Sequence, residues 1–200
     1  MKNIVFIWAH NDDAEIFAWW TLLKHLHNWD KVFLCIFDNW NSIRQKEQIA
    51  ADKISKFKSF YFKNEEDLKC IIKKISPDII ITHRHEDTHP DHRRVSNVAL
   101  NVMKYIKIQC KNNFLSFFCN THNGFWLNWE FEPTIYIDIS DYSNKKKQVI
   151  NCFVSENPSY RNKKSESITR RYWNRCNKEH VEWFRKFNYL GLIDCNDLLS

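Results

Sequence analysis

Two short segments of the chain hold most of the side chains that could perform chemistry. Residues 9–13 read AHNDD and residues 83–92 read HRHEDTHPDH, so both are dense in imidazoles and carboxylates. Each follows an apolar run typical of a buried strand, at residues 3–8 and 78–82 respectively. Ligands in open α/β sheets bind beyond the carboxyl ends of the strands, so we expect the two segments to face one crevice.

His10 and Asp13 in the first segment, together with His92 in the second, could form a metal site. Two imidazoles and one carboxylate are typical ligands of a catalytic zinc ion, which keeps a further position open for water. His89 and His92 lie three residues apart around Pro90, and proline is favoured at the first position of a helix. His92 can therefore point from the first helical turn into the same crevice as His89.

A structural interpretation of the same residues competes with this one. Asp12 or Asp13 could cap the helix that follows, and the histidines could be solvated. Capping requires a single acid, however, and leaves the other titratable groups unexplained. Because clustered titratable groups mark functional sites, we favour a metal or catalytic site. His83 and His85 could contact the metal ligands without binding the metal themselves, but we expect them to be solvent-exposed loop residues.

The elements around these segments predict an α/β fold, because strand-like runs alternate with helical apolar spacing. The predicted strands are residues 3–8, 31–37, 58–62, 78–82, 114–119 and 134–138. The predicted helices are residues 14–27, 42–56, 65–76, 91–107, 143–155 and 165–186, and residues 157–166 are predicted to be a surface loop. We expect one domain over residues 1–200, with a Rossmann-like, doubly wound, mostly parallel sheet and helices on both faces.

Composition limits the classes of partner and compartment. The net charge of +6 comes from 30 basic and 24 acidic residues spread along the chain, which favours anionic small molecules over nucleic acid. Seven cysteines without a CxxC pair, and no secretory signal pattern, predict a reduced, cytoplasmic protein. No apolar stretch has the length of a membrane span, so we expect no membrane anchor. A homo-oligomer is compatible with the sequence.

Longer motifs around both segments resemble a known family. AHNDDAE (residues 9–15) resembles the first signature of the PIG-L/LmbE-like zinc-dependent N-deacetylases, and EDTHPDHRRV (residues 86–95) resembles their D-x-H-x-D-H signature. An R-x-x-E segment from Arg44 to Glu47 lies between them, and a P-x-x-Y-x-D-I-S segment follows at residues 133–140. The resemblance implies hydrolytic removal of the N-acetyl group from an N-acetylglucosamine-type sugar or sugar conjugate. The implied cofactor is Zn²⁺ or another divalent transition metal.

The resemblance also implies roles for individual residues. The implied metal ligands are His10, Asp13 and His92. Asp12 would be the general base that deprotonates the metal-bound water. His89, hydrogen-bonded by Asp91, would stabilise the tetrahedral oxyanion or protonate the leaving amine. Arg44 could contact substrate hydroxyls or phosphate, or it could be an exposed arginine paired with Glu47 on its own helix.

Other functions remain open at this point. Asn11 replaces the usual proline of the family, a loss of loop stiffness that should be tolerable. Tryptophans beside the site could fill the crevice and leave a catalytically impaired metal- or sugar-binding protein. A metal-assisted phosphoesterase is a third class, but its two metals would need more bridging carboxylates than these segments supply.

Nine tryptophans and two glycines are unusual for an α/β domain, which needs glycine at turns and helix ends. Trp29 and Trp40 stand in turn-like segments, whereas Trp8, Trp19 and Trp20 stand where the family pattern has glycine or another small residue. One hypothesis is that the gene uses UGA for glycine and that these five positions were read as tryptophan. The alternative is a real indole lining that stacks on sugar faces. Neither interpretation is assigned to Trp126, Trp129, Trp173 and Trp183.

Overall fold

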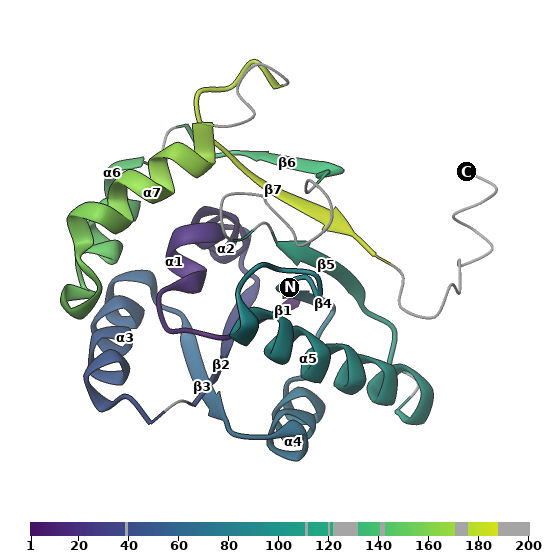
Figure 1. Ribbon diagram of the computed structural model, residues 1–200. Coiled ribbons are helices and arrows are strands. Elements are labelled where there is room, and N and C mark those ends of the chain that lie inside the picture. Colours follow the sequence, from purple (N-terminus) through teal and green to yellow (C-terminus); the bar gives the residue numbers. More distant parts are fainter. Residues whose placement is uncertain are drawn as a thin grey trace.

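A twisted β-sheet forms the frame of the molecule (Figure 1). The computed structural model describes residues 1–38, 40–110, 112–119, 121, 132–140, 143–170 and 176–187. The strands in these residues are β1 (Asn3–Trp8), β2 (Lys31–Phe37), β3 (Lys58–Phe62), β4 (Ile79–Thr82), β5 (Leu115–Cys119), β6 (Ile135–Asp138) and β7 (Val181–Lys186). Their order is β3-β2-β1-β4-β5-β7-β6. The strands from β3 to β5 in this order are parallel, whereas β7 runs antiparallel to both of its neighbours.

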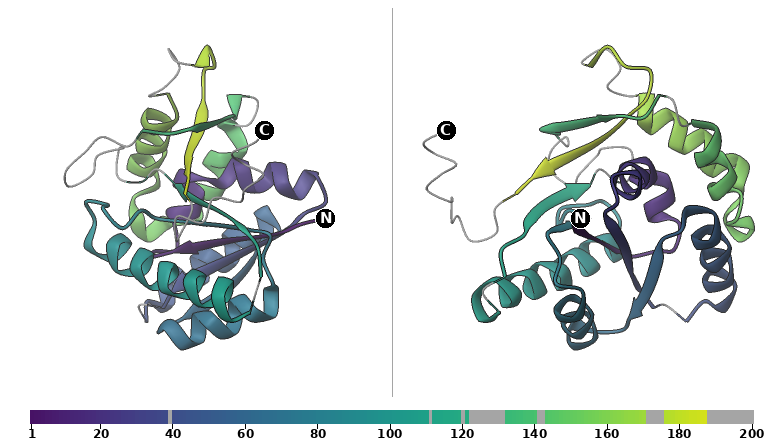
Figure 2. Two further views of the ribbon diagram at one scale, coloured as in Figure 1. Left: turned by 90° about the vertical axis from the view of Figure 1, so that its right-hand side faces the viewer. Right: turned by 180° about the vertical axis from the view of Figure 1, so that it is seen from behind.

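Helices cover both faces of the sheet, as the two further views show (Figure 2). They are α1 (Asp13–Phe17), α2 (Trp19–His27), α3 (Ser42–Ser55), α4 (Glu65–Ile75), α5 (Pro90–Gln109), α6 (Ser143–Ile150) and α7 (Pro158–Arg170), with a short 3-10 helix, η3 (Val154–Glu156). Successive side chains of a strand point to opposite faces. Ile4 and Phe6 of β1 therefore pack in the core that contains α1 and α2, and Val5 and Ile7 pack in the core that contains α4 and α5. The predicted doubly wound, mostly parallel fold is confirmed.

The last third of the chain departs from the sequence prediction. The helix predicted over residues 165–186 is wrong, because α7 ends at Arg170 and β7 inserts between β5 and β6. The surface loop predicted over residues 157–166 is also wrong, because most of it is helical. Asn157 caps this helix by accepting a hydrogen bond from the Tyr160 backbone N–H at 3.3 Å, a start signal hidden in a very polar stretch. Helix α7 is thus held by a narrow buried stripe rather than by a wide apolar face.

The order of the strands brings the two polar segments together. Strand β1 lies between β2 and β4, and its Ile7 pairs with Thr82 of β4 in a parallel register. The chain after β1 and the chain after β4 therefore leave the same edge of the sheet side by side. Pro90 occupies the start of α5, as its position in the sequence predicted. In the described part of the chain, no helix is both long enough and apolar enough to cross a lipid bilayer.

Two exposed tryptophans adopt a backbone conformation that favours glycine. Trp29 has φ 65° and Trp40 has φ 62°, and their exposed fractions are 85% and 75%. After α2, the N–H of Trp29 bonds the carbonyl of Leu26 and the N–H of Asp30 bonds the carbonyl of His25, each at 3.0 Å. These two bonds form a Schellman motif with tryptophan at the position usually taken by glycine.

Three other tryptophans fill core positions with ordinary backbone conformations. Trp8, Trp19 and Trp20 are buried in the core beside α1, and the indole N–H of Trp19 donates to Ser55 Oγ at 2.6 Å. The backbone therefore favours glycine at Trp29 and Trp40 but not at these three positions, where the decoding hypothesis depends on the family pattern alone. Trp183 lies buried in β7. Trp126, Trp129 and Trp173 lie outside the described residues.

We predict that Trp29→Gly raises the free energy of unfolding by about 1 kcal/mol, because a side chain in the left-handed region costs about 1–2 kcal/mol. The indole of Trp29 is mostly exposed, so its removal loses little buried apolar surface. Trp29→Ala is the matched control, since it removes the indole but keeps Cβ, and it should give less than half of the gain. Urea denaturation measures both variants. The decoding hypothesis is tested separately by reading the codons, and UGG at the five positions refutes it.

Candidate metal and catalytic site

The carboxylate of Asp13 lies at the centre of the site. The backbone N–H of His10 donates to Asp13 Oδ2 at 2.8 Å, and His10 Nδ1 lies 3.3 Å from the same oxygen. His92 Nε2 lies 3.5 Å from Asp13 Oδ1, and His83 Nε2 lies 3.3 Å from Asp13 Oδ2. Imidazoles from the ends of two adjacent strands therefore surround one carboxylate.

For Asp13 and His92, the neighbouring charges outweigh the effect of burial on the pKa, whereas for His83 burial dominates. Burial opposes ionisation of Asp13, but His92 and His10 hold the pKa of its carboxyl well below the usual range. Burial also opposes protonation of His92, yet the carboxylates of Asp13 and Asp87 raise its pKa to about 10. Burial, with a further contribution from His92, lowers the pKa of His83 to about 4. Asp13 is therefore held as a carboxylate by positive charge beside it, a charge that a divalent cation would supply on displacing the imidazole protons.

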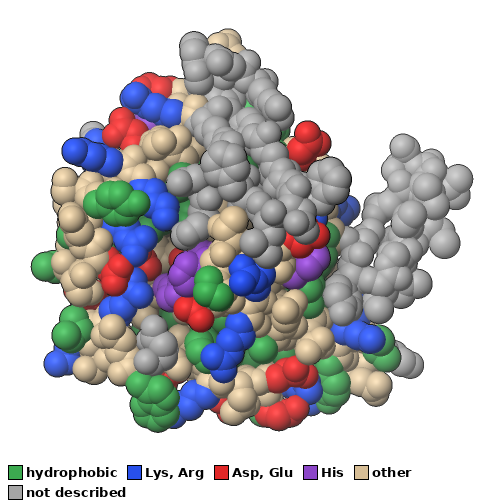
Figure 3. Space-filling model, in the orientation of Figure 1, with side chains coloured by type: hydrophobic (Ala, Val, Ile, Leu, Met, Phe, Trp, Pro, Cys, Tyr) green, Lys and Arg blue, Asp and Glu red, His purple; other side chains and the backbone are tan. Residues whose placement is uncertain are grey.

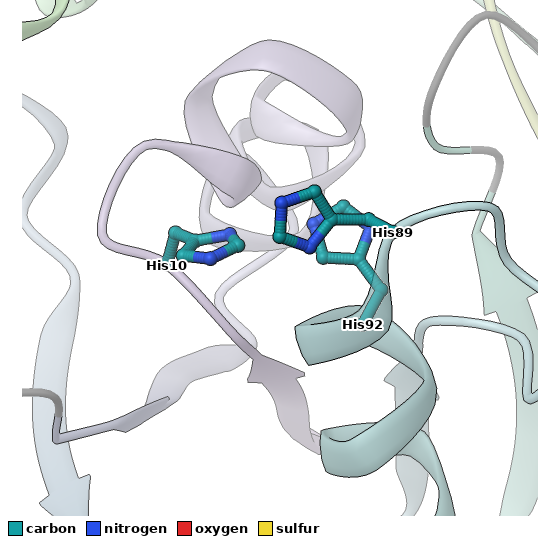
Figure 4. Close-up of side chains that lie close together, drawn as sticks. All are labelled: His10, His89 and His92. Carbon is teal, nitrogen blue, oxygen red and sulfur yellow. The ribbon is translucent and has the colours of Figure 1, made fainter.

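Among the residues that the structure describes, two groups of three donor residues are compact enough to hold a metal ion. The groups are His10, His89 and His92, and Asp13, His83 and His92, and the ligand atoms within each lie within 4.8 Å of one another. The set predicted from the sequence combines His10 of the first group with Asp13 of the second and the shared His92. Figure 4 shows the rings of His10, His89 and His92 gathered between the chain after β1 and the start of α5. Imidazole nitrogen and carboxylate oxygen suit zinc and related divalent ions, so the donor set fits this class of metal.

His83 is fully buried, so the prediction that it is an exposed loop residue is wrong. Its Nε2 accepts a hydrogen bond from the Ala9 N–H at 3.0 Å, and its ring stacks on that of His92 with centroids 4.0 Å apart. The residue directly follows β4, so its side chain enters the space between β1 and α5. His85, two residues later, is exposed as predicted.

Asp87 holds His92 from the side away from Asp13, a contact that the sequence analysis did not predict. Asp87 Oδ2 lies 3.1 Å from His92 Nδ1, and the hydroxyl of Thr121 donates to the same oxygen. Asp87 Oδ1 accepts from the backbone N–H of His89 at 2.8 Å. A carboxylate on the second nitrogen fixes the tautomer and orientation of a ligating imidazole. Asp87 belongs to the second motif, but nothing in the sequence distinguishes its role from the roles of the neighbouring acids Glu86 and Asp91.

Asp91 lies between two histidines at the mouth of the site. Its Oδ2 is 3.3 Å from His10 Nε2 and 4.0 Å from His89 Nδ1, so the carboxylate is nearer to His10 than to the histidine expected from the resemblance. The backbone N–H of Asp91 donates to His89 Nδ1 at 3.3 Å. His89 is consequently both the residue that caps α5 and a side chain of the site.

Asp12 lies between two guanidinium groups. Arg44 Nη2 donates to Asp12 Oδ1 at 2.7 Å, and Arg161 Nε lies 3.1 Å from Asp12 Oδ2. Glu156 pairs with both arginines. Burial and the neighbouring Asp13 raise the pKa of Asp12, while the two arginines limit the rise. Asp12 therefore binds a proton more readily than an exposed aspartate, which suits a general base.

Arg44 is buried, so the alternative interpretation of an exposed arginine paired with Glu47 is wrong. Glu47 instead accepts hydrogen bonds from the backbone N–H and the hydroxyl of Ser155, at 2.8 and 2.7 Å. Arg44 Nη2 lies 3.3 Å from Glu156 Oε1. The R-x-x-E segment of α3 therefore fastens η3 beside Asp12. No pattern in the sequence pointed to Glu156 or Arg161. Arg161 belongs to the stretch wrongly predicted to be a loop, and Glu156 lies between that stretch and the helix predicted over residues 143–155.

A cavity of about 260 Å³ opens beside these groups. Its lining residues are His10, Asp12, Asp13, Phe17, Arg44, His89, His92, Glu156, Arg161 and Lys164. Figure 3 shows histidine side chains at the surface of this face, close to acidic and basic ones. The tryptophans in the described residues are absent from this lining. Within the described chain they therefore neither fill this cavity nor offer it an indole surface.

The fold is shared with several solved enzymes, although no protein-family model matches the chain. The 4-carboxy-2-hydroxymuconate hydratase from Pseudomonas putida KT2440 has a TM-score of 0.78 at 14% identity, over 94% of this chain and 97% of the other. The N,N'-diacetylchitobiose deacetylase from Pyrococcus horikoshii has a TM-score of 0.77 at 20% identity, over 98% and 88%. A zinc-inhibited form of teicoplanin deacetylase has a TM-score of 0.70 at 14% identity, over 93% and 99%.

The chain has the fold of these enzymes. Deacetylases of the LmbE/PIG-L type are among its structural neighbours, in agreement with the family resemblance of its motifs. The hydratase has the same fold and a different reaction, so the fold alone does not determine the chemistry. The side chains of the cavity determine which reaction this chain can catalyse.

We predict that Asp13→Asn and His92→Gln lower the content of bound divalent metal at least tenfold, because each removes a ligand atom of the predicted set. His89→Gln should keep the metal, since His89 belongs to the alternative group of three histidines. His85→Gln is the matched control in the same segment, with an exposed side chain. Metal analysis of the purified variants makes the comparison. Loss of metal in His89→Gln with retention in Asp13→Asn would favour the alternative group.

Proposed function

We propose that the protein is a metal-dependent hydrolase that removes the N-acetyl group from an N-acetylglucosamine-type sugar or sugar conjugate. One observation carries the proposal: His10, Asp12, Asp13 and His92 line a single cavity. Hydrolysis of an amide needs a group that polarises the carbonyl, a base for water and a proton donor for the leaving amine. The cavity contains a candidate for each. The chitobiose and teicoplanin deacetylases on the same fold support N-acetylated amino sugars as the substrate class.

His10, Asp13 and His92 are the proposed metal ligands, with Asp87 and the backbone of α5 holding His92 in place. A bound divalent cation would supply Lewis acidity, which polarises a carbonyl and acidifies water. Zn²⁺ is the first candidate for this donor set. Because one solved form of the teicoplanin enzyme is inhibited by zinc, the proposal also includes other divalent transition metals.

Asp12 is the proposed base, because it is a buried carboxylate with a raised pKa that lines the cavity. Arg44 contacts one oxygen of Asp12 and Arg161 contacts the other. The two contacts keep the carboxylate in one orientation as it accepts the proton from water. His89 stands at the amino end of α5, where the helix dipole favours negative charge. From there its ring can donate to the developing oxyanion or to the leaving nitrogen. Asp91, which lies beside both His10 and His89, orients these rings.

A second candidate is the addition of water to a carbon–carbon double bond, favoured by the likeness to the hydratase. Both reactions use a base that activates water beside a metal or other electrophile. They differ in the product, since only the hydrolase releases acetate. A catalytically impaired relative is the third possibility, and it would bind metal and sugar without releasing acetate.

We predict that Asp12→Asn lowers kcat for acetate release by at least about 100-fold, because the substitution keeps the size of the side chain and removes the base. The metal content should stay unchanged. The assay uses metal-loaded full-length protein with N-acetylglucosamine and with N,N'-diacetylchitobiose, and acetate is measured enzymatically. Glu86→Gln is the matched control, an acid in the second motif that does not line the cavity.

Unchanged turnover in Asp12→Asn would remove Asp12 as the base. If the wild type releases no acetate from any N-acetylated sugar conjugate, the deacetylase proposal fails. Loss of diene absorbance from hydroxymuconate substrates would then support the hydratase.

A further inference from the structure

Lys164 of α7 is the cation of the cavity that lacks a recorded anionic partner among the described residues. It lines the same cavity as His10, Asp12 and Asp13. Its Nζ lies 5.9 Å from the centroid of the Phe17 ring, at the end of α1. Within the described chain no hydrogen bond or ion pair of Lys164 is recorded, so its ammonium group faces the cavity with its donors available.

The other two cations of the cavity are already matched. Arg44 and Arg161 contact Asp12 on one side and Glu156 on the other. The third acid of the lining, Asp13, is surrounded by imidazoles. Among the described residues, Lys164 is therefore the positive charge of this lining that no carboxylate contacts, and a divalent cation in the site would add to it.

Lys164 is held half-buried rather than extended into water. Arg161 lies three residues earlier on α7, so the two side chains project from the same face of the helix. Burial, together with the positive charge of Arg161, lowers the pKa of Lys164. Partial loss of water is unfavourable for an ammonium group without an anion beside it, and this cost is reduced when an anion binds.

We propose that Lys164 binds an anionic oxygen group, a phosphate or a carboxylate, carried by the amino-sugar substrate. The proposal rests on the function proposed above and narrows its substrate class to anionic N-acetyl amino sugars. Lysine is a point charge that suits either anion. The anion would lie toward α7, on the side of the cavity away from α5, which leaves the acetyl group beside His89 and the metal ligands.

A structural role for Lys164 is the competing explanation. Its aliphatic stem could cover Phe17 while the charged end remains in solvent. A structural lysine would affect neutral and anionic sugars equally. The two explanations are therefore separated by comparing neutral and anionic sugars in the wild type and in Lys164 variants.

The test measures kcat/KM for acetate release and Kd by calorimetry, using metal-loaded full-length protein. The probes are neutral N-acetylglucosamine, N-acetylglucosamine 1-phosphate and N-acetylmuramic acid, which carries a carboxylate. We expect wild-type protein to prefer at least one anionic sugar over the neutral one by about tenfold, and the preference to shrink as salt is added. Lys164→Met, which keeps the length of the side chain, should abolish the preference, and Lys164→Arg should retain most of it. Lys163→Met is the matched control, an exposed lysine next to it in the chain.

The outcomes separate this proposal from the deacetylase proposal. Acetate release from all three sugars without preference, or a preference that survives in Lys164→Met, overturns the anion site and leaves the deacetylase standing. Binding of an anionic sugar that depends on Lys164, without acetate release, supports the anion site and overturns the deacetylase. Comparison of the two anionic sugars assigns phosphate or carboxylate.

Discussion

The parallel pairing of β1 with β4 is the constraint on which the site depends. These strands come from distant parts of the sequence, yet their register places the residues after Ile7 beside the residues after Thr82. Backbone hydrogen bonds between neighbouring strands fix this register, and the burial of alternate side chains on two faces makes a shift by one residue very costly. The metal-binding candidates therefore need no flexible loop to meet. His10 lies two residues after β1, Asp13 begins α1 and His92 lies in the first turn of α5, so rigid elements position all three. This suits a site that has to hold ligand atoms within a fraction of an ångström.

The charged groups around Asp12 have a second structural effect. Asp12 comes from the chain after β1, Arg44 from α3, and Glu156 and Arg161 from η3 and α7. Burial of these charges is tolerable because each carboxylate meets a guanidinium, and loss of one partner would leave the others buried and uncompensated. The arrangement also joins the parallel half of the sheet to the helices that cover its far end. A comparable buried contact, of Glu182 in β7 with Thr21 and Lys146, ties α2 and α6 to the antiparallel strands.

The parallel core, and the convergence of the two polar segments on one cavity, could be predicted from the sequence for reasons that can be named. The early strands are short, continuously apolar and rich in β-branched residues, and Pro90 marks the start of α5. The residues of both motifs lie next to those strands, so their convergence followed from the topology. Arg161 and Glu156 could not be predicted in the same way. The contact of Arg161 with Asp12, and that of Glu156 with Arg161, depend on a helix that the polar sequence around Asn157 did not reveal. His83 was misjudged because the burial of an imidazole depends on what packs over it, here the ring of His92 and the backbone of Ala9.

The two walls of the cavity are also synthesised at different times. The wall that contains His10, Asp12, His89 and His92 belongs to the parallel strands and to α5, which emerge from the ribosome first. The opposite wall, with Glu156 and Arg161, emerges only after those strands are complete. A nascent chain that has folded its parallel core therefore carries an exposed Asp12 with one arginine instead of two. The electrostatic environment of the proposed base is therefore complete only when α7 has packed beside the chain after β1.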